Sequence, residues 1–411
     1  MTTIPTLSDL DFQTLLNDVY RPVFAEFAQG AQPREDHRHL LFPEISRLRG
    51  LGFGALRLPK AEGGAGLSLP QLFDLLAELA AADANLPQAL RNHFAFVEQH
   101  LNEAPGPNRD KWLTRIREGA IAGGAWTEPG AQALSTFETL LTPDGAGWRL
   151  NGRKFYATGS IYADWLEVAC RQGQENVIAR VRNDSPGLTH HDDWDGFGQQ
   201  LTGSGTSVYK NVPVAAEDVI PFTGRFSYQP VFYQLILLSV LVGITAAVLR
   251  DAVALVKARP RAYPQGNAAR GQDDVQIQQI IGEIAARATG AKAVFLAAAA
   301  KTQLAYEANI SSADETTRNR LKLEAEIATY EAQIVIAEAA QLVSTRIFDA
   351  LGSSATSVKL RLDRHWRNAR TVISHNPLAF RSRMVGDWYL NGNAPDFTPK
   401  YLPQDQPSVT D

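Results

Sequence analysis

The sequence contains very little of what marks secreted or disulfide-bonded proteins. It has one cysteine, Cys170, among 411 residues, so no disulfide can form within the chain. Residues 1–5 contain neither the basic segment nor the apolar segment of a secretory signal. We therefore expect a cytoplasmic protein.

The sequence also lacks an excess of charge of either sign. It has 40 Lys and Arg against 44 Asp and Glu, which gives a net charge of −4. The basic residues are scattered except in residues 361–370, so no basic stripe indicates nucleic acid, and that segment suits a small anionic ligand better. The histidine pairs lack the spacing with carboxylates that a metal site needs: His37 and His39, His190 and His191. We expect neither nucleic acid nor metal to bind.

Long hydrophobic runs are scarce, and the most notable one lies at residues 231–249. About 20 apolar residues can cross a bilayer, but Gln234, Ser239 and Thr245 interrupt this run. A helix that is apolar all round is equally expected in the centre of a helical bundle or at an oligomer interface. We therefore expect a buried helix and no membrane segment.

The pattern of apolar residues changes twice along the chain. Residues 1–118 show helical spacing, with Pro and Gly turns between the periodic segments. Residues 119–226 contain short alternating runs, such as 148–151 and 166–169, which are typical of antiparallel strands. Helical spacing returns in residues 227–411, where Ala-rich stretches allow helices to approach closely. These three ranges are the expected domains.

Four segments form a recognisable set. Residues 58–68 hold a proline and a double glycine before a helical pattern, residues 125–130 read Ala-Trp-Thr-Glu-Pro-Gly, and residues 151–159 form an aromatic and hydroxyl-bearing strand. The arginine-rich residues 361–370 then precede His375. This set resembles the acyl-CoA dehydrogenase family over nearly the whole chain after about residue 30. The resemblance implies an α+β fold, mostly α, with an N-terminal helical domain, a central antiparallel β-domain and a C-terminal four-helix bundle.

The two β-domain segments contain the residue types that a flavin ring requires. An isoalloxazine is a flat, mostly apolar body with polar edges, so its site needs an apolar platform with hydroxyl and backbone donors. Trp126, Thr127, Tyr156 and Thr158 supply these groups. Each residue type is also a good strand former, but together, on segments that the family places on one face, they predict flavin contacts.

Several departures from the family pattern bear on the reaction. Many family members have a catalytic Glu where this chain has His375, and the alternative position for that Glu falls near Tyr233, with no carboxylate in the neighbouring sequence. Residues 132–134 replace a Gly-Ser-Asp that helps to hold the thioester. Residues 258–264 replace the Arg-x-x-Phe-Gly that binds FAD. Desaturation therefore has no obvious base, and FMN is expected rather than FAD.

These departures are shared with the reduced-flavin-dependent monooxygenases of the same fold, which residues 154–165, 192–199 and 366–371 resemble. The resemblance implies FMNH₂ supplied by a separate NAD(P)H-dependent flavin reductase, reaction with O₂ to a C4a-hydroperoxyflavin, and oxygen transfer to a small-molecule substrate. We expect that substrate to be neutral or apolar, with sulfur oxygenation favoured over nitrogen hydroxylation. We also expect a homotetramer.

The resemblance assigns roles to particular residues. His375 and His93 are candidates for the peroxide side of the flavin and Thr158 for a donor to N5, although His93 could equally be a satisfied core histidine. Arg259 and Arg370 match positions that bind the FMN phosphate, although an exposed salt bridge is equally open for either.

One position near the expected flavin departs from the monooxygenase pattern. Gly124 stands where relatives often carry an Asn, so that contact must be lost or replaced. Two other functions remain open. They are an FAD-dependent acyl-CoA dehydrogenase and a non-catalytic scaffold on the same fold.

Overall fold

The computed structural model describes residues 6–128, 137–259, 263–311 and 313–396, and begins with a layer of helices. These helices are α1 (Asp9–Leu15), α2 (Arg21–Asp36), α3 (Phe42–Gly50), α4 (Leu69–Ala82), α5 (Leu86–Ala89), α6 (Arg91–Leu101) and α7 (Pro107–Arg117). The glycine-rich segment before α4 is a turn, because Gly63 and Gly66 have φ values of 85° and 71°, which favour glycine. Ser68 and Gln71 then form a capping box that starts α4.

The middle of the chain folds into one sheet. Its strands are β1 (Ala122–Ala125), β2 (Leu140–Asp144), β3 (Gly147–Lys154), β4 (Trp165–Gln172), β5 (Glu175–Arg182), β6 (Leu188–His190), β7 (Ser207–Val214) and β8 (Val219–Pro221). The order is β6-β7-β3-β2-β4-β5-β8, and β1 pairs with β4. Most pairs are antiparallel, as expected, but β1 and β2 both pair with β4 in parallel. The sheet is therefore mixed.

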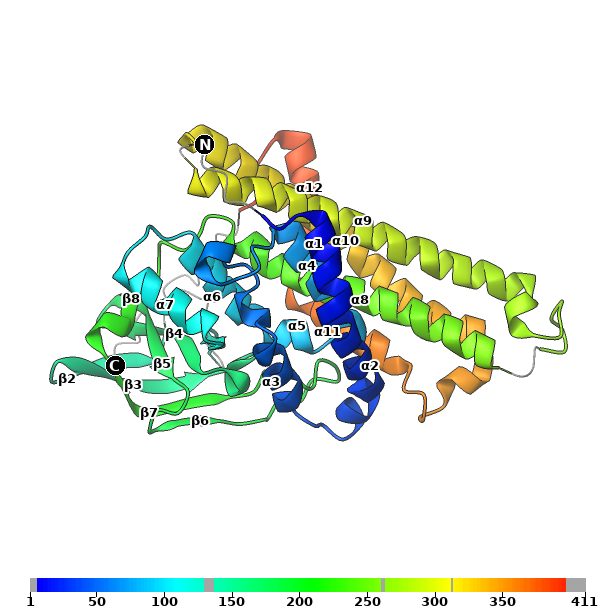
Figure 1. Ribbon diagram of the computed structural model, residues 1–411, viewed down its shortest axis with the longest axis horizontal. Helices are drawn as coiled ribbons and strands as arrows, with labels where there is room; N and C mark the ends of the chain where they lie inside the picture. Colours follow the sequence, from blue (N-terminus) through cyan, green and yellow to red (C-terminus); the bar gives the residue numbers. More distant parts are fainter. Residues whose placement is uncertain (1–5, 129–136, 260–262, 312, 397–411) are drawn as a thin grey trace, which may run out of the picture.

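Long helices return after the sheet, namely α8 (Gln229–Ala258), α9 (Val275–Ile310), α10 (Glu315–Leu351), α11 (Asp363–His375) and α12 (Leu378–Asn391). In Figure 1 the sheet lies at the left, and the helices α8, α9 and α10 project beyond the rest of the molecule at the right. By length and composition α8 could cross a membrane, but 89% of its most apolar 18-residue window is buried within the protein. It packs as the core helix that the sequence predicts.

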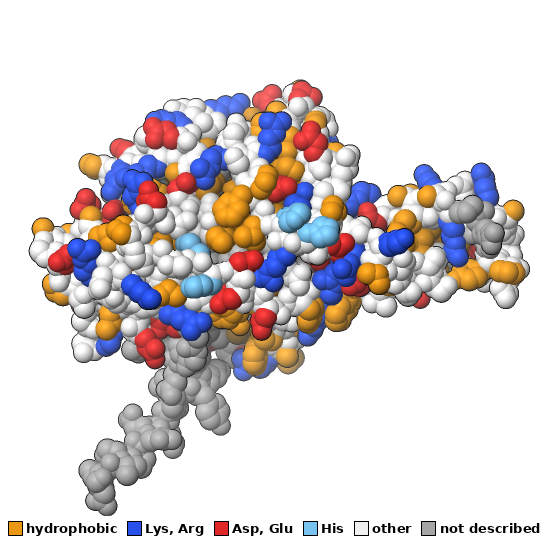
Figure 2. Space-filling view, turned by 90° about the horizontal axis from the view of Figure 1, so that it is seen from below, with side chains coloured by type: hydrophobic (Ala, Val, Ile, Leu, Met, Phe, Trp, Pro, Cys, Tyr) orange, Lys and Arg blue, Asp and Glu red, His pale blue; other side chains and the backbone are white. Residues whose placement is uncertain are grey.

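The core joins the N-terminal helices to the long helices. The ring of Phe73 on α4 lies 5.3 Å from that of Phe232 on α8 and 6.0 Å from that of Phe295 on α9. A Cβ added at Gly243 would lie 2.4 Å from the Cβ of Ala80, so α4 and α8 approach closely there. On the face shown in Figure 2, basic and acidic side chains are interspersed, and no stripe of one sign crosses it. The fold class is the one that the sequence predicts.

Candidate active site

Three residues that are far apart in the sequence meet at one end of α8. Arg91 is the first residue of α6, and its Nη1 lies 3.2 Å from Nε2 of His375, the last residue of α11. The same guanidinium lies over the ring of Tyr233 in the first turns of α8, 5.2 Å from its centroid. Arg91 therefore lies between His375 and Tyr233, the two places where the resemblance led us to look for a catalytic Glu.

The next residue, Asn92, ties this group to the sheet. Its Nδ2 donates to the carbonyl of Gly124 at 3.3 Å and to the carbonyl of Thr158 at 3.0 Å. A Cβ added at Gly124 would lie 3.0 Å from Cγ of Asn92 and 3.1 Å from Nε1 of Trp126. The amide of Asn92 thus occupies the space that a side chain at position 124 would need. The change to Gly124 is compensated from α6.

A buried ion pair fixes the segment after β1 against the end of β3. Nζ of Lys154 lies 2.6 Å from Oε1 of Glu128, and both side chains are almost fully buried. Burial raises the pKa of Glu128, but hydrogen bonds from Lys154 and the backbone outweigh it and leave that pKa below its usual value. Oγ1 of Thr127 accepts from the backbone N–H of Tyr156 at 2.7 Å. The two expected flavin segments therefore lie side by side.

These segments expose aromatic surface. Tyr156 is 53% exposed, and its ring meets that of Trp194 edge-on at 5.6 Å. Trp126 is half-buried, 5.5 Å from the ring of Phe222 and 5.4 Å below the guanidinium of Arg225. Exposed aromatic surface of this kind fits a flat, mostly apolar ring system. The residues present therefore fit a flavin.

Thr158 belongs to a chain of hydroxyl groups whose direction can be assigned. Its Oγ1 lies 2.8 Å from Oγ of Ser204, which lies 2.7 Å from Oγ1 of Thr202, which donates to the carbonyl of Gln199 at 2.9 Å. Each hydroxyl has one hydrogen, and a carbonyl can only accept. All three contacts are satisfied only if Thr158 donates to Ser204 and Ser204 donates to Thr202. Oγ1 of Thr158 is then left as an acceptor, not as the N5 donor that we expected.

His375 is exposed at the end of α11 but lies close to other protein groups. Its side chain is exposed, yet surrounding protein atoms restrict its hydration. This burial, with the charges of Arg91 and Arg381, lowers the pKa of His375 to about 3, although hydrogen bonding to Asn376 acts in the opposite direction. The imidazole is therefore neutral near pH 7. Because Arg91 donates to Nε2, the ring hydrogen is on Nδ1. An acid with a pKa of about 6.5, as we expected, is not what this environment produces.

His93 is a core histidine in this structure. It is fully buried, its Nε2 lies 3.0 Å from the carbonyl of Gly54, and its Nδ1 accepts from the backbone N–H of Ala122 at 3.2 Å. Burial lowers its pKa to about 4. Both ring nitrogens are occupied by backbone groups, so neither is free for a flavin or for oxygen. The structure contradicts the expected catalytic position of His93.

The two expected phosphate ligands lie in very different places. Arg370 is on α11, five residues before His375, and its Nη1 donates to Oε1 of Gln341 at 3.4 Å. Arg259 ends α8 and donates to the carbonyl of Leu351 at 2.8 Å. Gln234 accepts a hydrogen bond from Asn376, the neighbour of His375. Arg259 follows Gln234 by 25 residues, which at 1.5 Å per residue places it about 37 Å along the helix from the His375 end. One chain cannot present Arg259 and His375 to the same FMN molecule.

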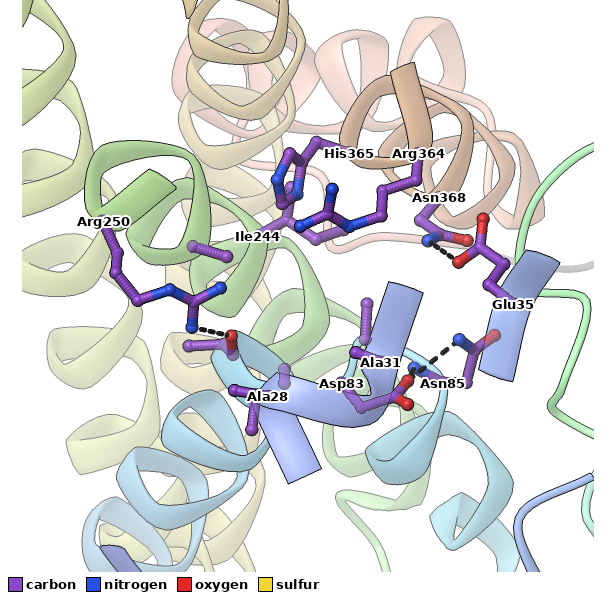
Figure 3. A pocket seen from close by; sticks show the side chains of 15 residues that line it. Ala28, Ala31, Glu35, Asp83, Asn85, Ile244, Arg250, Arg364, His365 and Asn368 are labelled. Atoms are coloured by element: carbon purple, nitrogen blue, oxygen red, sulfur yellow. Dashed lines mark hydrogen bonds between the residues drawn. The ribbon is translucent and has the colours of Figure 1, made fainter. Parts of the chain in front are cut away.

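Polar side chains around a small cavity beneath α11 hold that helix in place. It measures about 30 Å³ and lies among α2, α4, α8 and α11 (Figure 3). Nδ2 of Asn368 donates to Glu35 at 3.0 Å, and Nε2 of His365 lies 2.9 Å from Oδ2 of Asp251. The volume is sufficient for one or two water molecules but not for a substrate. This network anchors the helix that ends at His375.

Two of the segments that depart from the family pattern lie wholly or partly outside the described residues. Residues 132–134 and 260–262 lie outside the described residues. No group of three or more potential metal ligands occurs in the part of the chain that the structure describes. Sequence reasoning missed Arg91, Arg225 and the role of Ser204. Arg91 lies two residues before His93, which the resemblance had marked as a candidate, and this proximity was the one available signal.

Comparison with known proteins identifies the families and relatives that this chain resembles. Residues 123–212 match the family described as "Acyl-CoA dehydrogenase, middle domain", and residues 235–380 match "Acyl-CoA dehydrogenase, C-terminal domain". The probable FMNH₂-dependent monooxygenase SfnC of Pseudomonas putida is 26% identical, over 92% of this chain and 95% of its own length. A dibenzothiophene monooxygenase of Mycolicibacterium goodii is 26% identical, over 86% and 88%.

A solved structure extends the similarity to three dimensions. FMN-bound TdsC from Paenibacillus sp. A11-2 superposes with a TM-score of 0.82 at 27% identity, covering 92% of this chain and 98% of that one. The chain therefore belongs to the acyl-CoA dehydrogenase fold family, within the branch that contains reduced-flavin-dependent monooxygenases.

Proposed function

We propose that the protein is an FMNH₂-dependent monooxygenase that oxygenates a small organic molecule. The observation that carries this proposal is the direction of the hydroxyl chain, which leaves Oγ1 of Thr158 as an acceptor. Reduced flavin carries a hydrogen on N5, whereas oxidised flavin presents a lone pair there. An acceptor beside N5 therefore favours the reduced cofactor. The FMN-bound relative supports FMN as the flavin.

The environment of His375 argues against proton abstraction from an acyl thioester. The groups within contact of Arg91 are Tyr233 and the His375 ring, and among the described residues no carboxylate forms an ion pair with this arginine. An imidazole whose pKa is about 3 is a poor base near neutral pH. His375 is therefore an unsuitable base for the dehydrogenase alternative.

Each group has a defined task in the proposed reaction. Reduced FMN, when bound, supplies two electrons to O₂, so that one oxygen atom enters the substrate and the other leaves as water. Trp126 and Tyr156 provide the surface for the flavin ring, and Thr158 accepts from N5. Thr127 and the buried Glu128–Lys154 pair hold those segments in place. His375 offers a neutral imidazole on the substrate side, oriented by Arg91.

The assembly and the supply of flavin belong to the same proposal. FMNH₂ comes from a separate NAD(P)H-dependent reductase, and sulfur oxygenation is favoured over nitrogen hydroxylation, which the names of the dibenzothiophene monooxygenases support. Arg370 contacts the phosphate from the same chain. Arg259 contacts the phosphate bound by a second copy, because its own site is too far along α8. A homotetramer would bring the two together.

An anaerobic titration tests the cofactor assignment. We expect FMNH₂ to bind at least roughly tenfold tighter than FMN, which corresponds to about 1.4 kcal/mol, with no gain from FAD. Activity should require O₂ and a source of FMNH₂, either a flavin reductase or chemically reduced FMN. Tighter binding of oxidised FAD, with oxidation of an acyl-CoA in the absence of O₂, would establish the dehydrogenase instead.

A further inference from the structure

Arg91 is a half-buried arginine that forms no ion pair with a carboxylate among the residues that the structure describes. Its Nε is buried and makes no hydrogen bond with any residue that the structure describes. Other arginines deep in the protein are paired: Arg57 lies 3.0 Å from Glu98, and Arg180 lies 3.3 Å from Glu167. Burying a guanidinium without a carboxylate is unfavourable. The guanidinium of Arg91 therefore lacks a negatively charged partner among the described residues.

The neighbours of Arg91 add no negative charge. Tyr233 presents its ring, and burial raises the pKa of its hydroxyl to about 12, so it stays neutral. His375 presents Nε2 and is neutral as well. Burial also lowers the pKa of Arg91 itself, which shows that the charge is poorly solvated. The protein supplies aromatic and imidazole contacts where an anion would bind more strongly.

A second cation acts on the same side of the site. Arg381 on α12 lies over the ring of Tyr330 at 4.4 Å and is attracted to Glu326, yet its charge still reaches His375 and lowers the pKa of that residue. The exposed edge of His375 therefore faces a positive potential from α6 and from α12. Such a field attracts a small anion and disfavours a cation.

We propose that Arg91 binds the oxyanion of the substrate, so that the enzyme acts on a small organic acid such as a sulfinate or a carboxylate. A guanidinium matches the two oxygens of either group with parallel hydrogen bonds. The ring of Tyr233 lies beside the anion, and the apolar part of the substrate points toward the flavin segments, which Asn92 joins to Arg91. This assignment replaces the expected neutral substrate.

Anion binding would also change His375. The oxyanion takes over the hydrogen bond from Nη1, which releases Nε2 of the imidazole. It also offsets the positive charge of Arg91 and Arg381, so the pKa of His375 rises toward its ordinary value. Among the described residues, the other charged or titratable groups that act on this position are Tyr233 on α8, which itself lies near Arg225 and Glu167, and the Tyr330–Glu326 pair on α10. The substrate itself then prepares His375 to donate a proton.

Matched probes test the binding step without turnover. Calorimetry with the full-length protein, flavin-free and FMN-loaded, compares benzenesulfinate with methyl phenyl sulfoxide and benzoate with benzamide. Each pair has a similar shape and differs in charge. We expect at least one anion to bind roughly tenfold or more tighter than its neutral counterpart, because a hydrogen bond to a charged group is stronger than a neutral one. The sulfinate and carboxylate arms distinguish the two acids.

Variants identify the residue. Arg91→Gln should abolish the preference for the anion, and Arg91→Lys should retain part of it. Arg115→Gln is the control, because Arg115 also lies over aromatic rings, at 4.5 Å from Trp112 and 4.3 Å from Trp165, with a buried Nη1 that has no partner among the described residues. It should leave the preference unchanged. Thermal unfolding curves confirm that each variant is folded, and Arg91→Lys serves if Arg91→Gln is not.

Two results would overturn the inference. One is equal binding of the charged and neutral probes by the wild-type protein. The other is an Arg91→Gln variant that loses affinity for FMNH₂ but not for the anion, which would assign the guanidinium to the flavin. Anion binding by Arg91 does not depend on the proposed function, whereas oxygen transfer to the bound anion does. If the anion binds through Arg91 but no oxygen is ever transferred, the proposed function fails and the binding site stands.

Discussion

The replacement of Ser204 by Ala probes the hydroxyl chain that selects the reduced flavin. In the wild-type protein Thr158 gives its hydrogen to Ser204 at 2.8 Å, and the chain ends at the carbonyl of Gln199. Ser204→Ala removes that acceptor. The hydroxyl of Thr158 can then turn and donate to N5 of oxidised FMN. We expect oxidised FMN to gain affinity relative to FMNH₂.

The size of the effect follows from the one hydrogen bond that changes direction. A net hydrogen bond contributes about 0.5–1.5 kcal/mol, and 1.4 kcal/mol is a factor of ten in affinity. The ratio of the FMN to the FMNH₂ dissociation constant should therefore fall by roughly twofold to tenfold. For a two-electron couple 1.4 kcal/mol corresponds to about 30 mV. The potential of the bound flavin should become more negative by about 10–30 mV, because the oxidised form is stabilised.

Anaerobic titrations with both redox forms and a dye-equilibration potential measure this ratio. Ser160→Ala is the matched control: Ser160 is fully buried beside the same segments, but its hydroxyl donates to the carbonyl of Gly124 and lies outside the chain. It can weaken both redox forms together without changing their ratio. A Ser204→Ala ratio that stays at the wild-type value, or that moves further toward FMNH₂, would refute the assigned direction of the hydrogens.

Other predictions test the remaining parts of the site. His375→Ala should leave FMNH₂ binding within a few-fold but reduce product formation on the order of 10²-fold, with reduced flavin diverted to hydrogen peroxide in a peroxide assay. Glu128→Gln should destabilise the protein by about 3–5 kcal/mol at pH 7, because it leaves Lys154 buried without its partner. Since the folded-state pKa of Glu128 is lowered, this difference should be lost as the pH falls below about 4.3, which unfolding curves at several pH values would show. Light scattering should give a tetramer, and mixing Arg259→Ala with His375→Ala subunits should restore part of the activity if Arg259 acts on a neighbouring copy.

The architecture was predictable because it follows from local patterns. Strand alternation placed residues 148–151 and 166–169 in β3 and β4, and the apolar run at 231–249 became the buried helix α8. Pairing direction was less accessible. The parallel pairing of β4 with β1 and β2 depends on a path between strands that are distant in sequence, and alternation is the same in both kinds of sheet.

The sequence predicted only those site residues that lie on recognisable motifs. Trp126 and Thr158 lie on recognisable segments, but their neighbours come from other elements. Arg91 meets His375 only because α6 and α11 converge at the start of α8. The direction of the chain from Thr158 depends on the carbonyl of Gln199, which no residue type reveals. The sequence could not show that His93 is a core histidine for the same reason, because its two backbone partners come from residues 54 and 122.

Oxygen-isotope labelling shows whether the protein transfers oxygen from O₂ to its substrate. Protein loaded with chemically reduced FMN under anaerobic conditions is mixed with ¹⁸O₂ in the presence of benzenesulfinate or dibenzothiophene, and the products are analysed by mass spectrometry. A monooxygenase should give one ¹⁸O atom per product molecule and no product with oxidised FMN alone. The His375→Ala variant should give a much lower yield of labelled product. Absence of ¹⁸O from both products, together with acyl-CoA oxidation that proceeds without O₂, would contradict the account.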